Sequence, residues 1–134
     1  MAAALARIAA IAGLAALAGS ACSKADDAAR AAGPRDAVLA AWKAEKLEPA
    51  GMAPATVAFA KDCQSGAIAS VDVLVCNLAS PAEAKAAEEP ALTWIGSTTG
   101  AAQARGSALI VLADRKKADP NGRMINKLLK LAPK

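Results

Sequence analysis

Residues 71–78 carry the clearest pattern in the chain, because valines occupy one face of an extended strand while leucines and Cys76 occupy the other. A strand with two apolar faces is typical of the centre of a sheet. The pattern over residues 61–78 predicts a β-hairpin. If Cys63 lies opposite Cys76, the turn of the hairpin must fall near Ala69-Ser70, since a disulfide between the arms fixes their register.

The residue type of Gly66 would favour a turn closer to Cys63. The two signals disagree, and we let the cysteine pair decide the register. Gly66 is then interpreted as a β-bulge within the first arm.

Three segments show helical spacing and end signals. Pro34 opens a helix over 34–47, whose buried stripe includes Trp42 as a core residue or, alternatively, as a ligand platform. Ser80-Pro81-Ala82-Glu83 has the form of a capping box and opens a helix to about Glu89, where Pro90 stops or kinks it. A last helix starts at Asp119-Pro120, with its apolar positions at Ile125, Leu128, Leu129 and Ala132.

The remaining segments supply further strands. We expect a short strand at 56–60 and a second hairpin from 101–104 and 107–113 that turns at Arg105-Gly106. In residues 91–100, Trp94 and Ile95 favour burial, whereas Gly96 and Gly100 favour turns. We therefore interpret this segment as a packed loop, which could alternatively form the wall of a ligand pocket.

The order of elements predicts an α+β fold in one globular domain over 34–134. We expect a mostly antiparallel sheet of four to five strands with the helices packed on one face. Strand pairs followed by a helix occur twice, which suggests tandem ββα units.

The N-terminus has the composition of a secretory signal. A start with one positive charge precedes an unbroken apolar run over 8–18 and the small residues 19–21. The run is shorter than the ~20 residues that a membrane-spanning helix needs. We therefore assign 1–21 to a signal peptide and 22–33, which is small and charged, to a flexible tether.

The stretch Leu17-Ala-Gly-Ser-Ala-Cys22 resembles the lipobox of bacterial lipoproteins, in which the cysteine is lipidated and becomes the mature N-terminus. Gly19 stands where the usual pattern has leucine, so cleavage by an ordinary signal peptidase after Ser20 or Ala21 stays open. The resemblance implies attachment to a membrane through Cys22. Because Ser23 follows the cysteine, it also implies the periplasmic face of the outer membrane.

The number of cysteines also favours lipidation of Cys22. Three cysteines in an exported protein leave one odd thiol unless Cys22 carries the lipid and Cys63 pairs with Cys76. The alternative for the last two is a pair of buried thiols, since free cysteine behaves as a small hydrophobic residue.

Acid–base groups are few, so we predict no enzymatic activity and no catalytic residue. The chain has no histidine, which removes the commonest general base and the commonest metal ligand. The two cysteines beyond Cys22 lack the spacing of a zinc site, and no glycine-rich phosphate loop is present. We accordingly expect neither a metal nor a cofactor.

Basic residues concentrate at the C-terminal end. From Arg105 to Lys134 the sequence contains eight Lys and Arg and two Asp, so this segment has a net charge of +6. The whole chain has a net charge of +4. This end is a candidate anion-binding face for anionic lipid or an envelope protein, and the alternative is a solvated helix face. Nucleic acid is not expected, because the protein is exported and this end has no aromatic residue for stacking. The face comprises Arg115, Lys116, Lys117, Arg123, Lys127 and Lys130.

The sequence therefore predicts a small envelope lipoprotein that acts as a non-catalytic structural or interaction module. The alternative is a periplasmic module that binds a small ligand with residues 94–100.

Lipidation can be tested directly. Cells that express the protein and receive radiolabelled fatty acid should label the wild type and not Cys22→Ser. Equal labelling of the two proteins would show that Cys22 carries no lipid.

Overall fold

The structure, a computed structural model, describes residues 33–134, so the signal peptide, Cys22 and all of the tether except Gly33 lie outside the described residues. Eight elements follow one another within residues 33–134. They are α2 (Pro34–Ala44), β1 (Ala50–Val57), β2 (Ala60–Ile68), β3 (Val71–Asn77), α3 (Pro81–Ile95), β4 (Thr99–Arg105), β5 (Ala108–Asp114) and α4 (Arg123–Leu131).

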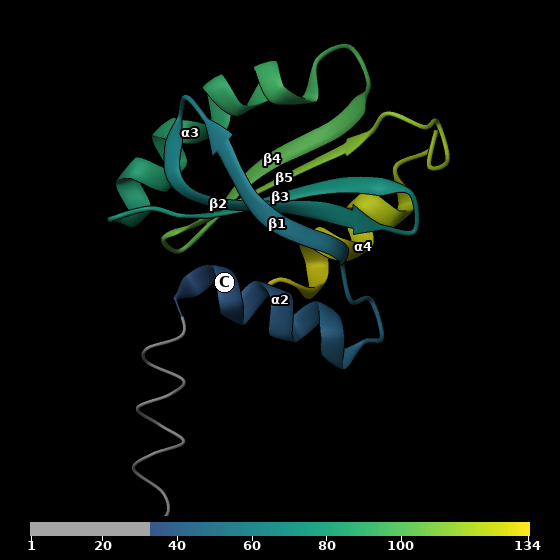
Figure 1. Cartoon of the computed structure of the whole chain (residues 1–134), viewed down its shortest axis with the longest axis horizontal. Helices are drawn as coiled ribbons and strands as arrows, with labels where there is room; N and C mark the ends of the chain where they lie inside the picture. Colours follow the sequence, from purple (N-terminus) through teal and green to yellow (C-terminus); the bar gives the residue numbers. More distant parts are fainter. Residues whose placement is uncertain (1–32) are drawn as a thin grey trace, which may run out of the picture.

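The five strands form one antiparallel sheet in the order β1-β2-β3-β5-β4 (Figure 1). The two strands that are apolar on both faces, β3 and β5, lie at its centre, as their composition requires. The predicted α+β class and the antiparallel sheet are confirmed. None of the helices within residues 33–134 has the length and apolarity needed to cross a bilayer.

Helices cover both faces of the sheet, so the prediction that all of them pack on one face is wrong. In Figure 1, α3 lies above the sheet, and α2 and α4 lie below it. The valines of β3 pack with α2 and α4, whereas Leu74 and Cys76 of the same strand pack with α3. The physical reason is visible in the sequence: a strand with two apolar faces needs cover on both sides.

Two ββα segments do occur, β2-β3-α3 and β4-β5-α4, but they are not copies related by a two-fold rotation. β3 and β5 are antiparallel neighbours, so a two-fold axis that exchanges them must be perpendicular to the sheet. A rotation about this axis does not exchange the two faces of the sheet, so two related copies would have their helices on the same face. Because α3 and α4 lie on opposite faces, the two segments have different three-dimensional arrangements.

The register of the β2-β3 hairpin agrees with the cysteine argument. Cys63 lies directly opposite Cys76 and is joined to it by a disulfide, with the two Cα atoms 4.1 Å apart. The turn falls at Ala69 and Ser70, which have φ of 47° and 70°. Both the pairing and the turn are therefore confirmed.

Gly66 is not itself a bulged residue, because β2 and β3 stay in register through its pairing with Val73. The irregularity lies in β1, whose register shifts between Ala50 and Ala53, opposite Gly66. Its role is a close approach to β1. A Cβ added at Gly66 would lie 2.8 Å from the carbonyl oxygen of Ala50 and 2.5 Å from Sδ of Met52. The backbone contact explains why this position has no side chain.

The predicted strand at 56–60 is wrong, since this segment contains the turn between β1 and β2. β1 ends at Val57, Ala58 and Phe59 form the turn, and β2 begins at Ala60. β1 is an exposed edge strand with two register shifts and with Pro54 in its middle. A proline in an edge strand removes a backbone donor and discourages pairing with another chain.

α3 continues through Pro90 to Ile95, so its predicted end at Glu89 and the predicted packed loop at 91–100 are both wrong. Pro90 lacks a backbone donor and normally interrupts a helix. Here a stripe of buried residues on both sides of Pro90, from Ala84 to Ile95, holds the helix on the sheet. Tertiary packing therefore overrides the local signal.

The other two helices are shorter than predicted, and the second hairpin turns one residue later, at Gly106. α2 ends at Ala44, and α4 begins at Arg123 instead of 119. Asp119 still serves its start, because its carboxylate accepts a hydrogen bond from the backbone N–H of Ile125 at 3.0 Å.

Trp42 is a core residue, as its spacing in α2 favours. Its side chain is fully buried among the residues that α2, α4 and the sheet contribute to one cluster. The indole Nε1 donates to the carbonyl oxygen of Leu128 at 2.9 Å. This bond joins α2 to α4 and satisfies the only polar atom of the ring.

Removing the disulfide should destabilise the fold. The bridge spans a sequence separation of 13, and in the chain-entropy model a loop of this size contributes about 3 kcal/mol. We expect Cys63→Ala/Cys76→Ala to lower the free energy of unfolding by about 2–4 kcal/mol in urea denaturation. A reductant should destabilise the wild type and leave the double variant unchanged; an equal effect on both proteins would contradict the prediction.

Candidate functional site

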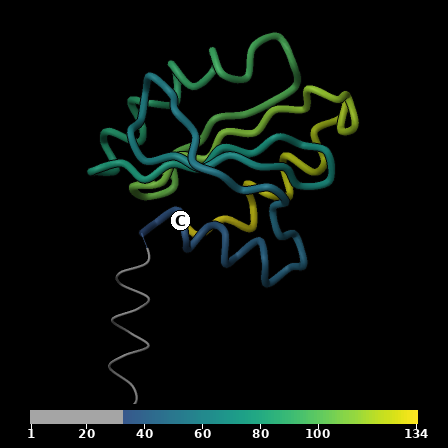
Figure 2. The backbone as a smooth tube through the Cα atoms, viewed as in Figure 1, coloured from purple at the N-terminus to yellow at the C-terminus, as the bar shows by residue number. Residues whose placement is uncertain are grey.

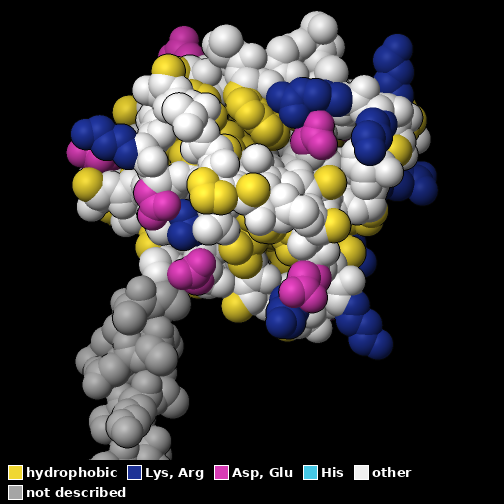
Figure 3. All heavy atoms as spheres, viewed as in Figure 1, with side chains coloured by type: hydrophobic (Ala, Val, Ile, Leu, Met, Phe, Trp, Pro, Cys, Tyr) yellow, Lys and Arg dark blue, Asp and Glu magenta, His cyan; other side chains and the backbone are white. Residues whose placement is uncertain are grey.

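An apolar groove lies between α3 and the β1-β2 hairpin. Its volume is about 840 Å³, and it is open to solvent. Apolar side chains are visible between the α3 layer and the sheet in the space-filling view (Figure 3). The lining residues are Thr56, Val57, Ala58, Phe59, Leu78, Glu83, Ala86, Ala87, Pro90, Thr93 and Trp94.

The groove exists because α3 covers only half of its face of the sheet. α3 packs against β4 and β5, and it leaves the same face of β2 without a helix. The β1-β2 hairpin bends upward beside α3 and forms the opposite wall (Figure 2). On the helix side, Ala86, Ala87 and Pro90 are too short to fill the space between the walls.

Aromatic side chains concentrate at the groove. The whole chain has two tryptophans, one phenylalanine and no tyrosine. Trp42 belongs to the core on the other face, whereas Phe59 and Trp94 both line the groove and are only partly buried. Two of the three aromatic residues are therefore available to a ligand.

Of the predicted pocket segment 94–100, only Trp94 lines the groove. The rest forms the end of α3 and the start of β4. Sequence reasoning missed the hairpin wall, although Val57 and Phe59 gave a signal as apolar residues at the end of β1 and in the turn that follows it.

Arg115, the first of the predicted anion-binding residues, contacts Trp94 and forms an ion pair with Asp72. Its guanidinium carbon lies 4.1 Å from the centroid of the Trp94 ring, and its Nη2 donates to the carbonyl oxygen of Trp94. Nη1 forms an ion pair with Asp72 at 3.0 Å. Asp72, the second residue of central strand β3, therefore interrupts the apolar pattern to bind this arginine.

Glu83 is the only ionisable residue that lines the groove. Its backbone N–H donates to Oγ of Ser80 at 3.1 Å, as the capping box predicts. The return bond from its carboxylate does not form, and within residues 33–134 the carboxylate has no ion pair or hydrogen bond. An exposed carboxyl group with no partner among residues 33–134 therefore lies at the groove.

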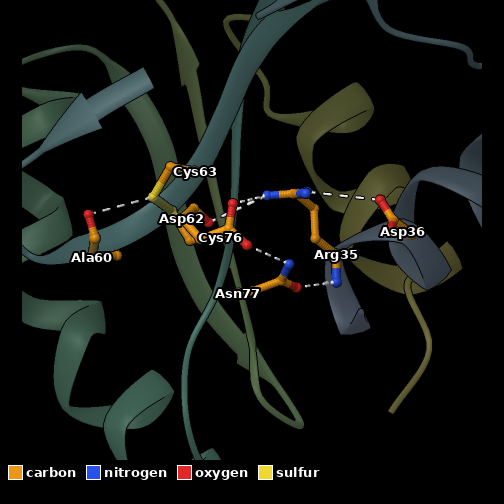
Figure 4. Close-up of polar contacts among 7 residues, drawn as sticks. All are labelled: Arg35, Asp36, Ala60, Asp62, Cys63, Cys76 and Asn77. Atoms are coloured by element: carbon orange, nitrogen blue, oxygen red, sulfur yellow. Dashed lines mark hydrogen bonds and ion pairs between the residues drawn. A yellow bond between two sulfur atoms is a disulfide. The ribbon is translucent and has the colours of Figure 1, made fainter. Parts of the chain in front are cut away.

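A polar cluster beside the disulfide has a structural role. Asp62 accepts hydrogen bonds from Asn77 at 2.9 Å and from Arg35 at 2.6 Å, and Asn77 accepts one from the backbone N–H of Arg35 at 2.8 Å (Figure 4). The bond from Asn77, and then the one from Arg35, keep the pKa of Asp62 below its ordinary value. The cluster attaches the start of α2 to the β2-β3 hairpin.

Glu88 protects the other edge of the sheet. Its carboxylate accepts from the backbone N–H of Ala104 in edge strand β4 at 2.8 Å and from Lys85 at 2.7 Å. The Ala104 bond, followed by the Lys85 bond, lowers the pKa of Glu88. The bond to Ala104 occupies an edge donor that could otherwise pair with another chain.

The other five predicted anion-binding residues are all exposed, and none forms an ion pair within the described chain: Lys116, Lys117, Arg123, Lys127 and Lys130. Arg123, Lys127 and Lys130 repeat at helical spacing on the outer side of α4. In Figure 3 blue side chains gather on the side where β5 leads into α4. We call these five residues the basic face.

Within residues 33–134 no group of three metal-ligating side chains comes together. The two buried acids, Asp114 and Asp119, both bind backbone N–H groups in the segment between β5 and α4. The carboxylate of Asp114 accepts from Ala118 and from Asp119, each at 2.8 Å. These acids therefore shape a loop.

Comparison of the chain with protein-family models, with curated proteins and with solved structures finds no match. The geometry of the groove and of the basic face is therefore the basis for assigning a function.

Proposed function

We propose that this protein is a non-catalytic binding module of the bacterial envelope, anchored through a lipid on Cys22, and that it holds an apolar ligand in the groove between α3 and the β1-β2 hairpin. The groove is the observation that carries the proposal. It opens to water yet is lined mainly by apolar side chains, a combination that marks binding sites on soluble domains.

Size and composition support this assignment. Ligand pockets commonly have volumes of about 300–1,000 Å³, with apolar walls and few polar groups. The groove has about 840 Å³, two aromatic residues and three polar ones, Thr56, Thr93 and Glu83. Water in contact with these apolar walls would be released when a ligand binds, which favours binding.

The chemistry of the lining supports a non-catalytic role. Glu83 is its one ionisable side chain. Acid–base hydrolysis commonly uses a pair of groups in different protonation states, and nucleophilic catalysis needs a nucleophile with a base beside it. The groove offers neither pair.

Two further features support the envelope assignment. The N-terminal sequence has the pattern of an exported lipoprotein. The disulfide between β2 and β3 suits an oxidising compartment such as the periplasm. Attachment to the outer membrane follows from Ser23 beside the lipidated cysteine, by resemblance to lipoproteins.

The basic face suggests how the domain is oriented on a membrane. It includes the outer side of α4, and α4 packs with α2, the first helix after the tether. A tether that begins at Cys22 can extend by about 3.5 Å per residue, which lets α4 reach the surface that holds the lipid. We infer that the basic face lies against anionic lipid or an acidic envelope protein, with the groove directed away.

Groove binding can be tested with the neutral fluorescent probe N-phenyl-1-naphthylamine. A chain of residues 23–134 contains the whole described fold and should enhance the emission of the probe. Ala86→Trp should lower its affinity at least tenfold, because Ala86 lines the groove and the added ring would fill it.

Ala82→Trp is the matched control, since Ala82 is exposed on the same helix but does not line the groove. It should bind the probe as the wild type does. No probe binding by the wild type, or equal loss in the two variants, would refute the groove as a binding site.

The basic face can be tested with vesicles that contain anionic lipid. Each basic residue near such a surface contributes about 1 kcal/mol, and screening acts over a Debye length of about 10 Å at 0.1 M salt. Binding of residues 23–134 should therefore weaken steeply as salt rises. Lys127→Glu/Lys130→Glu should weaken it at least tenfold.

Lys61→Glu/Lys85→Glu changes the net charge equally at exposed positions outside the basic face. It should reduce vesicle binding less. If the two double variants bind equally, net charge and not the basic face governs the interaction.

A further inference from the structure

We propose that the groove selects small cationic amphiphiles, molecules with one apolar chain that ends in an amine or a quaternary ammonium group. The inference rests on the proposed function and adds the chemical class of the ligand. Its basis is the unpartnered carboxylate of Glu83 in an otherwise apolar lining.

The charges around the groove favour a cation. No Lys or Arg lines it. Arg115 lies against the Trp94 ring, but its charge is paired with Asp72. Of the three acids of α3, Glu83 lines the groove, whereas Glu88 binds Lys85 and the backbone of edge strand β4. The one charged side chain of the lining is therefore an acid, although the whole chain carries +4.

The α3 wall has a length that suits a single extended chain. Glu83 and Trp94 bound this wall, and at 1.5 Å per residue they lie about 16 Å apart along the helix axis. One alkyl chain can lie along the groove over this length.

An added β-strand is disfavoured. β1 is the edge strand of the hairpin wall, and a peptide that paired with it would need a regular row of backbone donors and acceptors. Pro54 lacks a donor, and two register shifts break the regular row. The groove therefore offers side chains to a ligand and little backbone.

The two ends of the α3 wall fix the orientation of the ligand. Glu83 lies in the first turn of α3, where its carboxylate can face the cationic head. The apolar chain then runs along Ala87 and Pro90 toward Trp94. Thr93 is the one other polar residue of α3 in the lining. Arg115 lies against the Trp94 ring at the tail end, so a cationic head is disfavoured there.

Charge selectivity can be measured by displacement of N-phenyl-1-naphthylamine. The competitors are decyltrimethylammonium and decyl sulfate, which share a chain and differ in the sign of the head, each below its micelle concentration. For residues 23–134 we expect the cation to displace the probe at a roughly three- to fivefold lower concentration, the effect of one exposed ion pair. Added salt should reduce this preference.

Glu83→Gln should abolish the preference and retain probe binding, because it removes the charge and keeps the apolar walls. Glu89→Gln is the control, since Glu89 is exposed on the same helix and does not line the groove. It should keep the preference. Thermal melts verify that both variants fold.

Equal or stronger displacement by decyl sulfate in the wild type would overturn the inference, and so would a preference that survives in Glu83→Gln. Either result leaves the groove intact as an apolar site. Failure of the proposed function is a different outcome, in which the probe itself does not bind or Ala86→Trp has no effect.

Discussion

The two apolar faces of the central strands are the constraint on which the rest of the structure depends. β3 and β5 are neighbours, and β5 is buried along its entire length. Neither face can be left to water, so helices must pack on both sides. α2 and α4 share one face, where Trp42 bonds to Leu128, and α3 covers the other.

Cover of the second face is incomplete, and the groove is the result. A single helix packs over β4 and β5, so the hairpin side of that face is left open. The disulfide lies there, with Cys63 and Cys76 buried beside Leu74. It supports a region that has no helix above it, because it joins β2 covalently to the central strand.

Local signals predicted the features that depend on neighbouring residues. The pairing of Cys63 with Cys76 required the turn at Ala69, and the structure has it there. Local sequence signals gave wrong predictions where contacts between distant residues determine the structure. Pro90 argues for a helix end, but packing on the sheet carries α3 through to Ile95. The groove could not be predicted because its walls, α3 and the β1-β2 turn, meet only in the fold.

Charge follows the same two-sided architecture. The basic face includes the outer side of α4, whereas α3 on the other face of the sheet carries three acids, of which Glu83 lines the groove. Because the central strands place these helices on opposite faces, the charges are separated by the thickness of the domain. An anionic surface would attract the α4 side and repel the α3 side. The packing that buries the core would thus also direct the groove away from such a surface and leave it open to solvent.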